Sequence, residues 1–217
     1  MCFSASASFG ASAVLSVAGV ASFVYSRTLP QKALAGIPVI FAIQQFTEGI
    51  VWMSLMHAEW AQWERTATYA FLFFAQMAWP VYIPFAMLCC EREKIRRKVM
   101  SVLLLAGITL SAYIGYCLWN YSVVAVISMH HIRYDLGFAL AHKWYYGLLY
   151  FLPTIVSPIV SSIKRLHWLG YLFLISYVAA RLLFHYFEIS VWCFFGALIS
   201  LIIFVIIRES GKKYTIG

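Results

Sequence analysis

The sequence has very little charge. Asp, Glu, Lys and Arg together make up 11% of the 217 residues, and only eight residues are acidic; in soluble domains about 25% of the residues are charged. Apolar residues make up 63% of the chain, well above the roughly 45–50% of soluble domains. This composition excludes a soluble globular fold and predicts an all-α, polytopic membrane bundle with no sizeable domain outside the membrane.

Several motifs that would assign a chemistry are also missing. There is no CxxC pair, which argues against a quinone-linked disulfide oxidase. No GxSxG, HExxH or P-loop pattern occurs. The last apolar segment has no lysine for a retinal Schiff base, and no histidines are paired within a segment to hold haem. The sequence therefore indicates no particular cofactor.

The apolar segments predict seven transmembrane helices, each near the roughly 20 residues that a bilayer requires. The first has no basic residues ahead of it, which favours a span over a cleaved signal peptide. The predicted spans form one domain over residues 1–207, followed by a polar tail over 208–217. Their ranges are 6–26, 33–56, 66–90, 99–119, 144–163, 168–187 and 189–207.

The basic residues predict the orientation, because cytoplasmic loops are enriched in Lys and Arg. With the N-terminus outside and the C-terminus inside, twelve of the sixteen Lys and Arg residues fall in inner loops or the tail, and only Arg65, Arg133 and Lys143 in outer loops. The net charge of +8 is thus explained by the membrane and does not indicate nucleic-acid binding. The predicted location is a membrane, with the lipid bilayer as partner; no oligomeric state is predicted.

The second predicted span carries polar residues at a depth where they are costly. Gln44, Glu48 and Trp52 recur every four residues and share one helix face, with Gln45 beside them. Ionisable residues within a span face the protein interior or a wet cavity. We therefore expect this face to line a substrate- or ion-binding site.

Arg181 and His185 form a second polar stripe, near the outer end of the sixth predicted span. We expect Glu48 to contact Arg181 or His185, which would place both stripes in one pocket that opens to the outside. The plainer alternative is that Glu48 and Arg181 are a structural ion pair that joins two helices.

Two further groups on the outer side have residue types that bind metals or form disulfides. His130, His131 and Asp135 lie in the connection 120–143, but their spacing matches no known metal motif, and solvated loop histidines are the plainer interpretation. Cys2 and Cys193 fall at outer helix ends, where an oxidising compartment would favour a disulfide; Cys117 is the rival partner. The alternative is that these cysteines are small buried apolar residues.

Three blocks stand out in the sequence: the opening Met1-Cys2-Phe3-Ser4, the QQxxEGxxW block from Gln44 to Trp52, and the VWCFF block from Val191 to Phe195. In these blocks the chain resembles an uncharacterised family of small bacterial integral-membrane proteins. The resemblance covers the whole chain and implies a bacterial inner-membrane protein. It implies no activity and no functional residue.

Three functions are compatible with this sequence. A transporter for a small solute or an ion needs a polar site within the membrane, which the second span supplies. A membrane-embedded, metal-assisted hydrolase needs a ligand set, and a sensory or partner-binding subunit needs an output partner. We favour the transporter, because the chain carries the feature that it requires.

Overall fold

The computed structural model describes residues 4–143 and 145–213, and the described chain is mostly helical. The longer helices are α1 (Ala5–Tyr25), α2 (Leu29–Met56), α3 (Glu64–Leu72), α4 (Trp79–Cys90), α5 (Lys94–Asn120), α8 (Lys164–Leu183) and α9 (Glu188–Lys213). The shorter ones are α6 (Tyr146–Phe151), α7 (Ser157–Val160), the 3-10 turns η1 (Ala58–Trp63), η3 (Ala139–His142) and η5 (His185–Phe187), and the π-helical turns η2 (Phe73–Ala78) and η4 (Leu152–Val156).

Six helices are long and apolar enough to cross a membrane. They correspond to every predicted span except the fifth. The predicted span over 144–163 is shorter in the structure, where the helix runs over Tyr146–Val160. At about 1.5 Å per residue this helix is roughly 22 Å long, less than the roughly 30 Å of a bilayer core. It ends early because the backbone turns at Ser161, where Arg96 binds the carbonyl oxygens of Val160 and Ser161.

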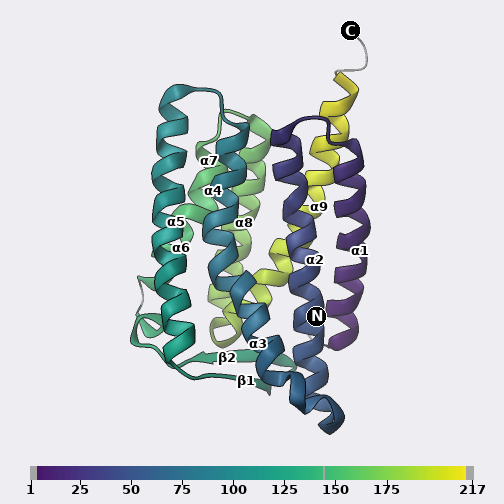
Figure 1. The fold of residues 1–217 in the computed structure, drawn as a ribbon, viewed down its shortest axis with the longest axis vertical. Helices are drawn as coiled ribbons and strands as arrows, with labels where there is room; N and C mark the ends of the chain where they lie inside the picture. Colours follow the sequence, from purple (N-terminus) through teal and green to yellow (C-terminus); the bar gives the residue numbers. More distant parts are fainter. Residues whose placement is uncertain (1–3, 144, 214–217) are drawn as a thin grey trace.

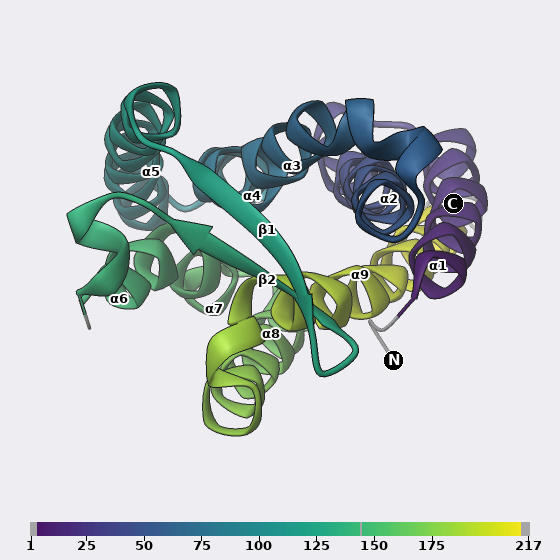
Figure 2. The ribbon, with the colours of Figure 1, turned by 90° about the horizontal axis from the view of Figure 1, so that it is seen from below.

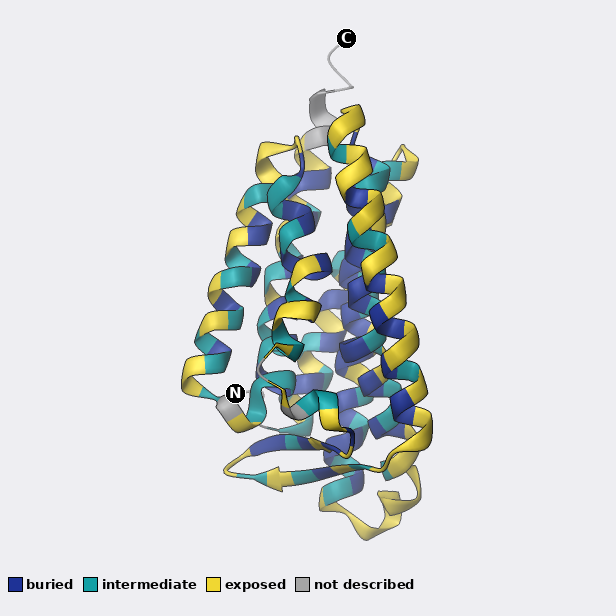
Figure 3. Cartoon of the chain, turned by 90° about the vertical axis from the view of Figure 1, so that its left-hand side faces the viewer, coloured by how far each residue is buried: buried dark blue, intermediate teal, exposed yellow. Residues whose placement is uncertain are grey.

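The helices form two layers (Figures 1 and 2). One layer holds α1 to α5, and the other holds α6 to α9. Buried positions lie on the inner faces of the helices (Figure 3), and the outer faces of α1 and α5 expose apolar residues such as Val17, Val24, Val102 and Leu105. Exposed apolar helix faces of this kind fit contact with lipid. These are the features of a multi-pass membrane protein.

A β-hairpin closes one end of the bundle, which corrects the prediction of an all-α chain. Strands β1 (Val123–Ser128) and β2 (His131–Leu136) pair antiparallel, from Val123 opposite Leu136 to Ser128 opposite His131. Met129 and His130 make the two-residue turn with positive φ angles of 47° and 64°, as a tight hairpin requires. The β-branched run in β1 favours a strand. The hairpin lies across both layers (Figure 2).

The two π-helical turns precede prolines. η2 ends just before Trp79-Pro80, and η4 ends just before Ser157-Pro158. Proline has no N–H to donate to the preceding turn and its ring crowds the carbonyl there, so the helix widens or bends. Side chains bind freed carbonyls of η2: the Tyr150 hydroxyl donates to Ala75 O at 2.6 Å, and the Ser111 hydroxyl donates to Met77 O at 2.7 Å.

Glu91 joins two loops at the end of the bundle opposite the hairpin. Its buried carboxylate accepts hydrogen bonds from the backbone N–H groups of Arg92, Glu93 and Ser162 and from the Ser162 hydroxyl, at 2.7–3.0 Å. Burial alone would raise the pKa of Glu91, but these hydrogen bonds together lower it. The carboxylate thus holds the α4–α5 connection against the α7–α8 connection.

We expect Glu91→Ala to lower the free energy of unfolding by about 2–3 kcal/mol at pH 7, because it leaves buried N–H groups without an acceptor. A lowered pKa contributes stability above the unfolded value of about 4.3 that is lost as the pH falls through the folded pKa. The difference between wild type and variant should therefore shrink below about pH 4. Glu93→Ala is the control, since Glu93 is half-exposed and forms a surface pair with Arg96 worth at most about 1 kcal/mol. Unfolding titrations in detergent at pH 7 and pH 4 measure both variants; equal losses at pH 7 would contradict the assignment.

Candidate ligand-binding cavity at the hairpin end

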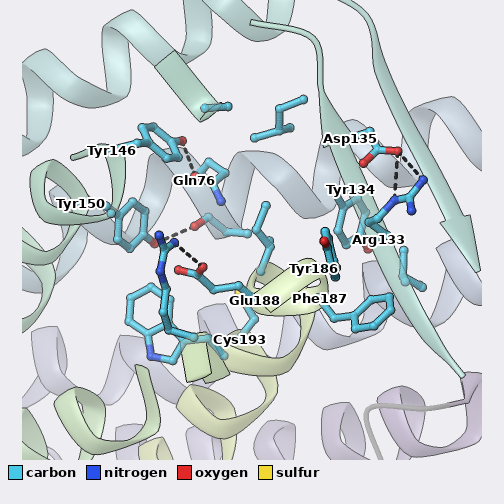
Figure 4. Close-up of a pocket in the computed structure, with 18 of the residues that line it drawn as sticks. Gln76, Arg133, Tyr134, Asp135, Tyr146, Tyr150, Tyr186, Phe187, Glu188 and Cys193 are labelled. Carbon is cyan, nitrogen blue, oxygen red and sulfur yellow. Dashed lines mark hydrogen bonds and ion pairs between the residues drawn. The ribbon is translucent and has the colours of Figure 1, made fainter. Parts of the chain in front are cut away.

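A cavity of about 440 Å³ lies beneath the hairpin. Its volume is within the range of small-molecule sites. Five parts of the fold supply its walls (Figure 4): β2, η2, α6 with η3, α8, and η5 with the first turns of α9. The cavity therefore brings together residues that are more than 100 positions apart in the sequence.

Aromatic side chains form one wall. The rings of Tyr150 and Tyr177 both make edge contacts with the Trp192 ring, at centroid distances of 5.4 Å and 5.1 Å. The Tyr146 hydroxyl donates to Gln76 Oε1 at 2.6 Å. This hydrogen bond and the one from the Tyr150 hydroxyl to Ala75 O both join α6 to η2. Together they fix the two tyrosine rings against the widened turn (Figure 4).

Charged side chains also line the cavity. Arg181 Nη1 donates to Glu188 Oε2 at 2.7 Å, and Arg133 donates to Asp135 Oδ2 through Nε and Nη2 at 3.1 Å and 2.9 Å. Lys143 is exposed at the edge of the cavity. Among the described residues, the walls thus hold three basic and two acidic side chains.

A second, apolar cavity of about 30 Å³ lies deeper in the bundle. It shares Tyr150, Trp192 and Cys193 with the larger one, and its remaining lining comes from α2, α4, η4, α8 and α9. Tyr150 and Trp192 therefore lie between the two cavities.

Glu48 is fully buried beside the larger cavity, between α2 and α9. Its Oε1 accepts from the Ser190 hydroxyl at 2.5 Å, and its Oε2 accepts from Gln45 Nε2 at 3.1 Å. The expected contact of Glu48 with Arg181 is wrong, since Arg181 pairs with Glu188 instead. The chain turns sharply between α8 and α9, which brings Glu188 back to Arg181. The side chain of His185, the other expected partner, lies outside the described residues.

The polar face of α2 is buried as its spacing predicts. Gln44, Gln45 and Trp52 are each at most 2% exposed. Gln44 Oε1 accepts from the Trp79 indole N–H at 2.6 Å, which joins α2 to the turn after η2. None of these α2 residues lines the larger cavity, so the predicted site divides into a buried network on α2 and a cavity beside it.

Tyr134 connects these two parts. It projects from β2 into the cavity lining (Figure 4) and is buried in the protein. Burial, with smaller contributions from nearby Glu48 and Cys193, raises the pKa of Tyr134 well above its ordinary value. Its phenol is therefore neutral at physiological pH.

The three candidate metal ligands do not converge. His130 is exposed in the hairpin turn, the buried His131 ring stacks on Phe187 at 4.6 Å, and Asp135 is paired with Arg133. Burial lowers the pKa of His131. Within residues 4–143 and 145–213, no three His, Cys, Asp or Glu side chains are grouped as metal ligands.

Of the predicted Cys2–Cys193 pair, the structure describes only Cys193. Cys193 is buried and lines both cavities. Cys117, the rival partner, is buried near the end of α5. Cys2 lies outside the described residues, so its pairing stays a prediction.

Sequence reasoning missed most of the cavity. Tyr146 and Tyr150 are four residues apart, a spacing that places them on one helix face, and Gln76 is a polar residue within an apolar run. Both signals were available. The meeting of these residues with Tyr177 and Glu188 depends on how the two layers pack, which no local pattern encodes.

The comparisons with known proteins give the family but no activity. A model described as a family of unknown function, DUF6629, matches residues 1–215. Neither the curated proteins nor the solved structures gave a match. The match spans nearly the whole chain and agrees with the resemblance to an uncharacterised family. The chain therefore belongs to the DUF6629 family of unknown function.

Proposed function

We propose that this protein is a membrane carrier that binds a small solute in the hairpin-end cavity. The observation that carries the proposal is a cavity of about 440 Å³, lined by ion pairs and tyrosines, within a bundle of membrane-length helices. Polar groups inside such a bundle are costly to keep and are commonly functional. A purely structural bundle would gain more from apolar packing at this position.

The basic residues support a cavity that opens to the outside of the cell. The α1–α2, α4–α5 and α7–α8 connections and the end of α9 lie at the end opposite the hairpin (Figure 1). Most of the Lys and Arg residues lie in these segments or in the helix turns next to them, including Arg27, Arg96, Lys164 and Arg208. By the positive-inside rule that end is cytoplasmic. The proposed setting is the bacterial inner membrane, with the hairpin on the periplasmic side.

The position of the deeper cavity supports transport rather than binding alone. A solute that leaves the larger cavity toward the cytoplasm would pass Tyr150 and Trp192 to reach the apolar cavity. Both π-helical turns contribute to these linings, η2 through Gln76 and η4 through Thr154. Such turns are frequent at functional sites. We infer that the aromatic pair is the inner barrier of the carrier.

Blocking the cavity mouth tests this proposal. Ala141 on η3 lines the cavity, whereas Ala139 on the same turn is exposed outside it. In a chain whose five native cysteines are replaced by serine, we expect a bulky maleimide on Ala141→Cys to abolish solute flux into proteoliposomes. The flux assay uses a labelled panel of organic acids, amino acids, sugars and organic cations.

The same adduct on Ala139→Cys is the matched control and should leave flux unchanged. Empty liposomes give the background. If the unmodified protein moves no member of the panel above that background, the carrier proposal fails. If the Ala141 adduct has no effect on a measured flux, the cavity is not the route.

A further inference from the structure

The charges that line the hairpin-end cavity do not balance. Its basic residues are Arg133, Lys143 and Arg181, and its acidic residues are Asp135 and Glu188. Each acidic residue already has an arginine partner, at 2.9 Å for Arg133–Asp135 and 2.7 Å for Arg181–Glu188. Among the lining residues that the structure describes, this leaves the ammonium group of Lys143 as surplus positive charge at the edge of the cavity.

Hydrogen-bond donors remain available in the cavity. The guanidinium of Arg181 has five N–H donors, and its bond to Glu188 uses one of them. Gln76 Oε1 already accepts from Tyr146, and its amide nitrogen points into the cavity (Figure 4). A ligand that supplies acceptors and negative charge would satisfy these groups.

The aromatic wall indicates the rest of the ligand. Tyr150, Tyr177 and Trp192 present adjoining ring surfaces on one side of the same cavity. Aromatic faces pack well against planar apolar groups. Arg181 and its partner Glu188 adjoin this wall, since both lie close enough to Tyr177 to interact with its hydroxyl.

We propose that the cavity binds a small organic anion, a carboxylate attached to an aromatic or planar apolar body. The carboxylate lies near Arg181 and Lys143, and the body lies against Tyr150, Tyr177 and Trp192. This inference rests on the proposed function, because it names the solute class of the same cavity. Arg is suited to this role, since its planar guanidinium matches a carboxylate.

Three probes of nearly equal size separate charge from shape: phenylacetate, phenylacetamide and phenethylammonium. We expect isothermal titration calorimetry of the purified full chain to give phenylacetate an affinity at least about tenfold above either of the others, because only the anion interacts favourably with the surplus positive charge. Phenylacetamide measures the contribution of the aromatic body alone.

Variants locate the anion. Lys143→Gln and Arg181→Gln should each lower the affinity for phenylacetate about tenfold and leave that for phenylacetamide nearly unchanged. Arg181→Lys keeps the charge and the pairing with Glu188, so it should retain part of the preference. Arg65→Gln is the matched control, because Arg65 lies at the same end of the bundle on α3, outside the cavity, beside the Tyr69 ring.

The outcomes distinguish the two proposals. An anion preference that disappears in Lys143→Gln or Arg181→Gln, but not in Arg65→Gln, supports the inference. If phenethylammonium binds best, or if no probe binds while the Ala141→Cys adduct still blocks flux, the anion class is wrong and the carrier proposal stands. If no probe binds and that adduct blocks no flux, both proposals fail.

Discussion

Glu48→Lys is expected to prevent the bundle from folding to its native stability, whereas Glu48→Gln is expected to fold almost as wild type does. The Glu48 side chain has no exposed surface, and its hydrogen-bond partners are Ser190 and Gln45, which are both uncharged. Lysine would place a cation among neutral groups in the membrane interior, at a cost of at least about 2.5–3.5 kcal/mol. Glutamine keeps the size; its amide oxygen can accept from the Ser190 hydroxyl, and its amide N–H can donate to Gln45 Oε1 once the Gln45 amide has rotated.

Glu48→Ala should fall between these two. It leaves the Ser190 hydroxyl and the Gln45 amide without partners, at about 1–3 kcal/mol for each buried group. Unfolding midpoints of the purified variants in a denaturing-detergent titration give the order. Glu59→Lys is the control, since Glu59 is exposed on η1. Equal stability of Glu48→Lys and Glu59→Lys would show that position 48 is in water and would contradict its buried network.

Gly107→Ala is expected to destabilise the packing of α5 against α4 by about 2 kcal/mol or more. A Cβ at this position would lie 1.8 Å from the Pro80 carbonyl oxygen and 2.6 Å from its carbon. Both atoms are backbone, so the clash cannot be relieved by a rotamer change, and the helices must separate. Overpacking in a dense interior typically costs about 1–3 kcal/mol, and occasionally more.

Gly10→Ala is the matched control, because a Cβ at Gly10 on α1 would meet nothing within 4 Å. We expect this variant to be as stable as wild type or slightly more stable, since alanine is the better helix former. The same detergent titration measures both glycine variants. A loss at Gly107 no greater than that at Gly10 would mean that α4 and α5 are farther apart than the structure places them.

The sequence was sufficient for the helices and for the buried face of α2. Long apolar runs predict spans directly, and the spacing of Gln44, Glu48 and Trp52 places them on one face whatever that face contacts. Both predictions depend only on distances along the chain. The fifth predicted span was too long, because hydropathy does not register the early turn at Ser161.

The partners of these residues were less predictable. Charge complementarity suggested that Glu48 contacts Arg181. It does not distinguish Glu48 from Glu188, and the sharp α8–α9 turn brings Glu188 next to Arg181. The hairpin was missed because a β-branched run such as Val123–Ser128 also fits an apolar loop beside a membrane. The cavity itself depends on β2, η2, α6, α8 and α9 packing together, which is a property of the whole bundle.

The central claim is that the hairpin-end cavity is open to the aqueous phase on the hairpin side of the membrane bundle. Thiol labelling of two positions on α8 tests this claim. Tyr177 lines the cavity, whereas Ile175, only two residues away and so at nearly the same depth in the membrane, is exposed on the outside of the bundle. The measurement is the labelling of Tyr177→Cys and Ile175→Cys by a membrane-impermeant maleimide in sealed vesicles of each orientation, with the native cysteines replaced. We predict labelling of Tyr177→Cys only from the hairpin side and no labelling of Ile175→Cys, which faces lipid. Labelling of both positions, of neither, or of Tyr177→Cys from the basic end would contradict the account.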